Sequence, residues 1–288
     1  MPDARLGSFA ASIIAFIAAT MVAGCSSIDE VIESAPKPSA RVLGAGVRNL
    51  SLQSLDLVFD VEVSNPYGVS LPLVDLTYTL ASSETRLLSG SIKPSGSVPA
   101  NGTSVVQLPA RLDLAAVLKT LPRVKPGAVV PFQAQLNLLV DVPLLGEMTL
   151  PLERSGEIPV PALPEITLLS FYVGTLDIDE LSAEARLRVK NTNKFRIDLA
   201  KIRFDLALDG RNVASTHLRA SPKLGPGQTA VVRIPLSLSP SALGAGVLDI
   251  LDGGDTGYTM SGRLDVITPY GELALPFSQR GNTTLRHK

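Results

Sequence analysis

Residues 58–80 read VFDVEVSNPYGVSLPLVDLTYTL, and this stretch decides the fold class of the chain. Up to Ser64, apolar and polar side chains alternate, which is the period of an antiparallel strand with one face in a core and the other in water. Asn65-Pro66 then interrupts the pattern, and a second strand is predicted at 73–80. The segment therefore predicts two consecutive strands joined by a corner.

The Asn65-Pro66 pair explains this interruption in structural terms. An Asn side chain can hydrogen-bond its own backbone two residues on and so imitate a turn. Pro66 supplies no N–H to a strand ladder and keeps the preceding residue out of the helical region. We therefore interpret the pair as a corner that ends one strand and aims the next, with a direct functional role for the asparagine as the alternative.

The same pattern returns 126 residues later, where residues 184–206 read EARLRVKNTNKFRIDLAKIRFDL. Asn191 stands at the position of Asn65, and Thr192 replaces Pro66. The polar side chains of the strand change from acidic to basic between the copies, whereas the apolar side chains persist. Such a pattern is expected when one face of the strand is core and the other is water.

The repeat predicts two tandem domains of one fold, at 38–160 and 164–288. It extends well beyond the corner, because ANGTSVVQL at 100–108 matches PGQTAVVRI at 226–234 in polarity and turn residues. The segment 158–164, IPVPALP, contains three prolines in seven residues and predicts an extended, fairly stiff linker.

Each unit is expected to contain several short strands and one short helix. Asp113 is the predicted N-cap of the first helix, and Ser239 followed by Pro240 begins the second. The glycines Gly44 and Gly46 are interpreted as flexible or capping positions. The strand at 73–80 has its counterpart at 199–208. The remaining strands are predicted at 104–109, 130–142 and 147–153, with counterparts at 230–238, 257–267 and 272–277. This content predicts a mainly β protein of two tandem antiparallel β-sandwich domains.

The N-terminus carries an export signal. Residues 9–23 form an apolar run of about 15 residues, too short for a spanning helix but typical of a signal peptide. The run ends in Val22-Ala23-Gly24-Cys25, and Cys25 is the only cysteine of the chain. This ending resembles the lipobox of bacterial lipoproteins, in which the signal is cut before a cysteine that then carries the lipid. A short anchor helix with a buried cysteine is the alternative.

The lipobox resemblance implies a location. Residues 1–24 would be the signal peptide, Cys25 the site of lipid attachment, and 25–37 a polar tether. Several acyl chains, at about 0.8 kcal/mol per buried CH₂, would hold the chain on a membrane. Ser26 resembles the sorting residue of outer-membrane lipoproteins, so the implied site is the bacterial envelope, on the outer membrane facing the periplasm.

Composition argues against nucleic acid as a partner. The net charge is −1, from 26 basic and 27 acidic residues, and the chain has no Trp. Phosphate binding needs a basic surface, and single strands need aromatic platforms. The hydrophobic content of 45% is sufficient for a sizeable core.

Reaction chemistry is weakly represented. No nucleophile elbow, zinc-protease motif or phosphate-binding loop occurs. His217 is interpreted as a surface residue, and a hydrolase would need it beside a serine and an acid. Two acidic clusters fall short of the six or more oxygens that calcium takes: Asp177, Asp179 and Glu180, and Asp249, Asp252 and Asp255. We therefore predict no catalytic residue, no cofactor and no metal.

The order of these features resembles the late embryogenesis abundant type 2 family, also called the WHy (water stress and hypersensitive response) domain. The resemblance rests on an alternating strand that ends in Asn65-Pro66, a long second strand, and a turn before the valine-rich segment at 104–109. The family pattern is usually Asn-Pro-Asn, whereas the second copy has Asn191-Thr-Asn193. The resemblance implies a fibronectin-like β-sandwich with a short helix and a non-enzymatic role in desiccation or membrane protection.

Two functions follow as expectations. The first is a lipid-anchored envelope protein that binds or protects surfaces under water stress, with a membrane as its partner through the N-terminal lipid. The second is a periplasmic carrier of lipid or another apolar ligand, favoured by the abundance of Leu and Val in the predicted sandwich faces. An envelope protein as a further partner stays open.

Overall fold

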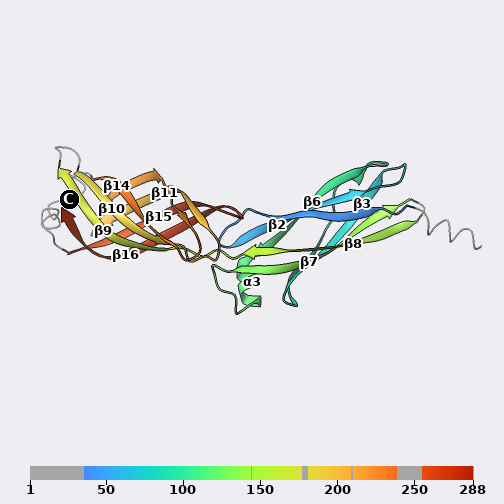
Figure 1. The fold of residues 1–288 in the computed structure, drawn as a ribbon, viewed down its shortest axis with the longest axis horizontal. Coiled ribbons are helices and arrows are strands. Elements are labelled where there is room, and N and C mark those ends of the chain that lie inside the picture. The colour runs from blue at the N-terminus through green and yellow to red at the C-terminus, as the bar shows by residue number, and fades with distance from the viewer. Residues whose placement is uncertain (1–35, 144, 177–180, 209, 239–254, 288) are drawn as a thin grey trace, which may run out of the picture.

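Two mainly β units lie end to end in an elongated molecule (Figure 1), as the repeat predicts. The computed structural model describes residues 36–143, 145–176, 181–208, 210–238 and 255–287. The predicted signal peptide, Cys25, most of the predicted tether, and the second predicted helix at Ser239 and Pro240 lie outside these residues.

The first unit is a sandwich of two antiparallel sheets. One sheet has the order β1-β2-β6, formed by β1 (Ser39–Arg48), β2 (Ser54–Ser64) and β6 (Thr103–Asp113). The other has the order β4-β3-β7-β8, with β5 beside β3, formed by β3 (Leu71–Ser82), β4 (Thr85–Ile92), β5 (Ser97–Val98), β7 (Val129–Val142) and β8 (Gly146–Pro159).

Alternating side chains build the core of this unit. Phe59 on β2 and Phe132 on β7 meet edge to face, with ring centroids 6.3 Å apart, and so connect the two sheets. Both rings are almost fully buried, and an edge-to-face pair of this kind adds about 0.5–1.5 kcal/mol beyond the buried area.

The helix α3 (Leu114–Thr120) directly follows β6. As predicted, Asp113 caps it, and the carboxylate accepts a hydrogen bond of 3.0 Å from the backbone N–H of Ala116. Leu114 and Val117 are buried, so one face of this short helix closes the end of the sandwich. A cap of this kind contributes about 1 kcal/mol.

In the second unit, the antiparallel strands form two groups, which β16 joins into one sheet of eight strands. The order is β12-β11-β15-β16-β9-β10-β14, with β13 beside β11. The last strand is longer than its counterpart, with 17 residues against 14 in β8. Its extension pairs in parallel with β9 and closes one side of the unit. The strands are β9 (Glu165–Leu176), β10 (Leu181–Lys190), β11 (Ile197–Leu208), β12 (Arg211–Arg219), β13 (Lys223–Leu224), β14 (Thr229–Leu238), β15 (Asp255–Thr268) and β16 (Gly271–His287).

Two sequence interpretations need correction. Gly44 and Gly46 lie within strand β1, in open space, and are not flexible or capping positions. The linker begins two residues later than predicted, because Ile158 and Pro159 still belong to β8. Ile158 is fully buried, and its pairing with Val130 holds it in the sheet.

Both valine-rich strands are sheet edges with a proline in their middle. Among the described strands, β6 pairs only with β2, and β14 pairs only with β10. Pro109 lies opposite Val58, and Pro235 lies opposite Glu184 at the matching position of the repeat. Because proline has no N–H, each edge lacks a donor that another strand would need for pairing.

Candidate functional site

The corner after β2 is held together by the side chain of Asn65, which is only 1% exposed. Its Nδ2 donates to the carbonyl oxygens of Val69, Val98 and Pro99 at 2.8, 3.1 and 2.9 Å. Its Oδ1 accepts from the backbone N–H of Tyr67 at 3.0 Å, which is the Asx turn that the sequence suggests. One side chain thereby fastens the corner to the distant turn that precedes β6.

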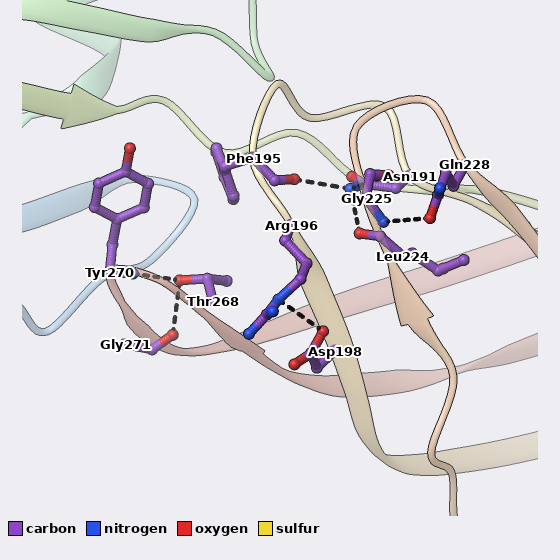
Figure 2. A network of polar contacts seen from close by, with 10 residues as sticks. All are labelled: Asn191, Phe195, Arg196, Asp198, Leu224, Gly225, Gln228, Thr268, Tyr270 and Gly271. Carbon is purple, nitrogen blue, oxygen red and sulfur yellow. Dashed lines mark hydrogen bonds and ion pairs between the residues drawn. The ribbon is translucent and has the colours of Figure 1, made fainter.

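Asn191 makes the same set of contacts in the second unit (Figure 2). Its Nδ2 donates to the carbonyl oxygens of Phe195, Leu224 and Gly225 at 2.8, 3.0 and 3.1 Å. Its Oδ1 accepts from the backbone N–H of Asn193 at 2.9 Å. All four partners lie 126 positions after those of Asn65. Both corners therefore have the same set of four hydrogen bonds around an asparagine side chain, which we call the clamp.

Asparagine is the side chain that this clamp requires. It presents two N–H donors to clustered carbonyls and one acceptor to an N–H, all within a short and rigid amide. An aspartate would bring a carboxylate against those carbonyl oxygens, and an alanine would leave the carbonyls without a partner. Both amides are thus fully used within the fold, and neither is free for a ligand.

The two corners differ in the residues that follow the asparagine, and the difference has a structural reason. In the second unit, Thr192 Oγ1 donates to the carbonyl of Leu163 at 2.8 Å. Asn193 accepts from the N–H of Ala162 at 2.7 Å and donates to its carbonyl at 3.2 Å. The positions that hold Pro66 and Tyr67 in the first copy therefore bind the inter-unit linker in the second.

A loop of the first unit also contributes to the contact between the two units, which we call the joint. Gly127 donates to the carbonyl of Val160 at 2.6 Å and accepts from the N–H of Lys194 at 2.7 Å. It has φ of +92°, and a Cβ there would lie 2.7 Å from the carbonyl oxygen of Thr192. Both the backbone conformation and the close approach of the two units therefore require glycine.

Tyr270 supports the joint from the turn between β15 and β16. Its hydroxyl donates to Glu157 of the first unit at 3.1 Å, and its ring meets Phe195 edge to face at 5.5 Å. Burial, and then the hydrogen bond to Glu157, raise the pKa of Tyr270 to about 12. In the same turn, Thr268 Oγ1 donates to the carbonyl of Gly271 and accepts from the N–H of Tyr270 (Figure 2).

His217 lies exposed on β12, opposite Arg203 on β11. Ser215 is two residues away on the same strand, but its hydroxyl bonds Asp205 directly, at 2.5 Å. A serine nucleophile needs its hydroxyl bonded to the base, with the acid on the far side of the imidazole. The contacts found here do not have this order.

Within the described ranges, no group of three or more His, Cys, Asp or Glu could hold a metal ion. The cluster at Asp177, Asp179 and Glu180 lies outside those ranges, as do Asp249 and Asp252 of the other cluster. Among the described residues, no helix has the length and apolar character needed to span a bilayer.

The first unit has an open groove of about 530 Å³ between β6 and the segment 92–97 that begins at the end of β4. Leu73, Val106 and Leu108 give it an apolar floor, and Lys93 and Gln107 are among its polar lining. Sequence reasoning did not find this groove, because it depends on how the segment 92–97 lies beside β6, which belongs to the other sheet.

The fold and the two corners together define a class of protein, a tandem repeat of one β unit. The polar residues that both copies share, Asn65 and Asn191, have a structural role. The model of the family described as late embryogenesis abundant protein, LEA type 2, matches residues 60–156 and 186–281. The chain therefore belongs to the late embryogenesis abundant type 2 family, with two copies of its domain.

Two plant proteins are similar to this chain over about the length of one unit. The desiccation protectant protein Lea14 homolog of Glycine max is 30% identical over 139 residues, which is 48% of this chain and 91% of that protein. Lea14-A of Gossypium hirsutum is 28% identical over 130 residues, 45% of this chain and 86% of that protein. The solution structure of a late embryogenesis abundant protein aligns with TM-score 0.39 and 26% identity, over 53% of this chain and 87% of that one.

Proposed function

We propose that this chain is a lipid-anchored, non-enzymatic protein of the bacterial envelope that protects surfaces under water stress. One observation carries the water-stress role: both units match the LEA type 2 family, and the Glycine max relative is named a desiccation protectant protein. The WHy designation, and the finer roles of binding and membrane protection, belong to the same proposal.

The chemistry of the corners supports a non-enzymatic role. The amides of Asn65 and Asn191 are buried and spend their hydrogen bonds on the chain's own backbone. At His217, the contacts of the neighbouring serine do not form a catalytic relay. A protein built in this way acts through its surfaces rather than through a reacting group.

Anchoring rests on the lipobox at Val22–Cys25 and is tested separately. Radiolabelled palmitate should enter the full chain, and Cys25→Ala should abolish the label and move the protein from membranes to the soluble fraction. A Ser26→Asp variant tests the sorting step, because it should shift the protein from the outer to the inner membrane. Equal membrane retention of the wild type and Cys25→Ala would remove the anchor from the proposal.

The stress role is tested by survival. A deletion strain should lose viability after drying and osmotic shock, and the wild-type gene should restore it. If the deletion strain survives as well as its parent, the water-stress role fails whatever the outcome of the palmitate experiment. Restoration by Cys25→Ala would show that protection does not need the anchor.

A carrier of apolar ligands is the second candidate, and the groove beside β6 favours it. Its apolar floor of Leu73, Val106 and Leu108 is where an acyl chain would lie. Native mass spectrometry after mild extraction should then show bound lipid, and Val106→Arg should remove it. A consistently lipid-free wild type would eliminate this candidate.

A further inference from the structure

The outer face of the sheet β1-β2-β6 combines exposed apolar side chains with carboxylates. Buried Phe59, Val61 and Val63 on β2 turn the intervening side chains outward. We call this surface the acidic face after Asp60 and Glu62 at its centre, where Leu43, Val105 and Gln107 also lie. Three arginines lie on the same face, Arg41 opposite Glu62 and Arg48 and Arg111 opposite Asp56.

The outer face of β9-β10-β14 in the second unit has the same layout with cations. We call it the basic face, and it contains Leu169, Arg186, Arg188, Val231 and Arg233. Each of these residues lies 126 positions after its counterpart on the acidic face. Aspartate and glutamate are replaced by arginine, and the neighbouring glutamine is replaced by a third arginine.

The apolar members of both faces are unusually exposed. Val105 and Val231 on the edge strands are 55% and 53% exposed, and Leu43 and Leu169 are 46% and 37% exposed. Both leucines sit at register shifts, in β1 and β9 respectively. The similar exposure at repeat-related positions indicates that the two faces have a similar shape.

The basic face has positive charge that the fold leaves uncompensated. Arg186 on β10 stands directly opposite Arg233 on β14, and like charges at facing positions destabilise a strand pair. Arg186 forms an ion pair with Glu184 at 2.7 Å. Over the described part of the chain, neither Arg188 nor Arg233 forms an ion pair.

The acidic face offers carboxylates at the matching places. Asp60 accepts only a neutral hydrogen bond, from Gln107 Nε2 at 2.9 Å. Glu62 pairs with Arg41 at 2.7 Å, but the Arg41 side chain is 72% exposed, and such surface pairs are worth at most about 1 kcal/mol. Both carboxylates therefore remain available to cations brought from outside.

We propose that the acidic face of one copy of this chain docks on the basic face of a second copy. Leu43 and Val105 would then lie against Leu169 and Val231, with carboxylates and guanidinium groups paired around them. Such a contact would cover exposed apolar surface and would also place carboxylates beside the arginines that have no ion-pair partner within the described part of the chain. It joins sheet faces rather than sheet edges, because prolines interrupt the edge strands β6 and β14.

The size of the faces fits a weak, reversible contact. Three strands spaced at about 4.8 Å and about ten residues long give roughly 14 Å by 34 Å, or about 500 Å² for each partner. One contact therefore buries about 1,000 Å², near the lower limit for a specific interface. Two such contacts in an antiparallel pair of chains would reach about 2,000 Å², which is typical of a stable dimer.

An anionic membrane is the competing occupant of the basic face, but the duplicated surface favours a second copy. A membrane would use the arginines alone and leave the acidic face, with its equally exposed leucine and valine, without a role. A second copy uses both faces, because Asp60 and Glu62 of one copy would meet the arginines of the other.

Sedimentation equilibrium of the full chain in a non-ionic detergent tests the contact. The wild type should self-associate at about 0.1 M salt and less at 1 M, where the Debye length falls from about 10 to 3 Å. Asp60→Arg with Glu62→Arg, and separately Arg188→Glu with Arg233→Glu, should each weaken association about tenfold or more. A mixture of these two double variants should associate again, because their faces are then complementary between chains.

The control is Glu147→Arg with Glu153→Arg, two exposed carboxylates on β8 in the other sheet, which should leave association unchanged. Circular dichroism of every variant verifies folding, and the N-terminal segment is the same in all of them. A wild type that stays monomeric, or double variants that do not recover on mixing, would overturn the proposal. Binding to phosphatidylglycerol vesicles that depends on Arg188 and Arg233, without self-association, would assign the basic face to membranes instead.

Discussion

Replacement of Asn65 by alanine should destabilise the first unit by about 4 kcal/mol. The side chain makes four hydrogen bonds, three donated to carbonyls and one accepted from the N–H of Tyr67. A neutral hydrogen bond contributes about 1 kcal/mol net, and a buried carbonyl left without a partner costs about 1–3 kcal/mol. Two amide hydrogens serve three carbonyls, so the sum is about 3–5 kcal/mol.

Urea unfolding followed by circular dichroism measures this effect. With a slope of about 2 kcal/mol per molar urea, the midpoint of the first unit should fall by about 2 M. Because two units can unfold separately, the transition must first be assigned to a unit. The matched control is Asn137→Ala, an exposed asparagine on β7 of the same unit, which should change stability by no more than about 0.5 kcal/mol.

Asn65→Asp separates the chemistry of the clamp from its shape. At neutral pH a carboxylate would face three carbonyl oxygens, so this isosteric variant should be at least as unstable as the alanine variant. Its pKa in the folded state would be raised above the unfolded value of about 3.9, so the stability of the variant should improve as pH falls toward 4. If Asn65→Ala behaves like Asn137→Ala, the clamp does not hold the corner and the reasoning is wrong.

Two further predictions concern the joint. Gly127→Ala should destabilise the contact between the units by about 2 kcal/mol or more, because a positive φ and a contact with the Thr192 carbonyl both oppose a Cβ. The control is Gly146→Ala, which has φ of +76° in open space and should cost only about 1 kcal/mol. Similar unfolding of the two variants would count against the close approach of the units at Gly127. Tyr270, with its pKa raised to about 12, should form phenolate well above pH 10 in an ultraviolet titration, and Glu157→Gln should lower that pKa toward 10. Because the folded pKa exceeds the unfolded one, the stability linked to Tyr270 is complete below pH 10 and is lost as pH rises toward 12; a titration unchanged by Glu157→Gln would refute the contact.

The sequence was most informative where local rules act alone. Alternation identified β2 and its counterpart β10, and the Asp113 cap was predicted because capping depends on a few adjacent residues. Strand β1 was missed, since its two glycines weaken the apolar pattern and its register shift after Val42 breaks the period of two. Its place in the fold is set by pairing with β2 rather than by its own sequence.

The clamp and the joint show a second limit. The Asx turn at Asn65 could be foreseen from two neighbouring residues, but the contacts to Val98 and Pro99 come from 33 and 34 positions away. The linker contacts of Asn193 are likewise made by tertiary structure. In both copies the asparagine was visible in the sequence, while its partners depended on how the strands pack.

The hydrogen bonds between the second corner and the linker make the order of the two units matter. Thr192 and Asn193 receive an incoming segment through a hydroxyl and an amide. At the first corner, Pro66 has no polar side-chain group, and the hydroxyl of Tyr67 is buried. An additional unit placed ahead of the first would find no receptor for its linker, while one placed after the second would need a Thr-Asn corner of its own. The two duplicated modules have thus become non-interchangeable parts, and exchanging their order by gene shuffling should yield two folded domains with a loose hinge.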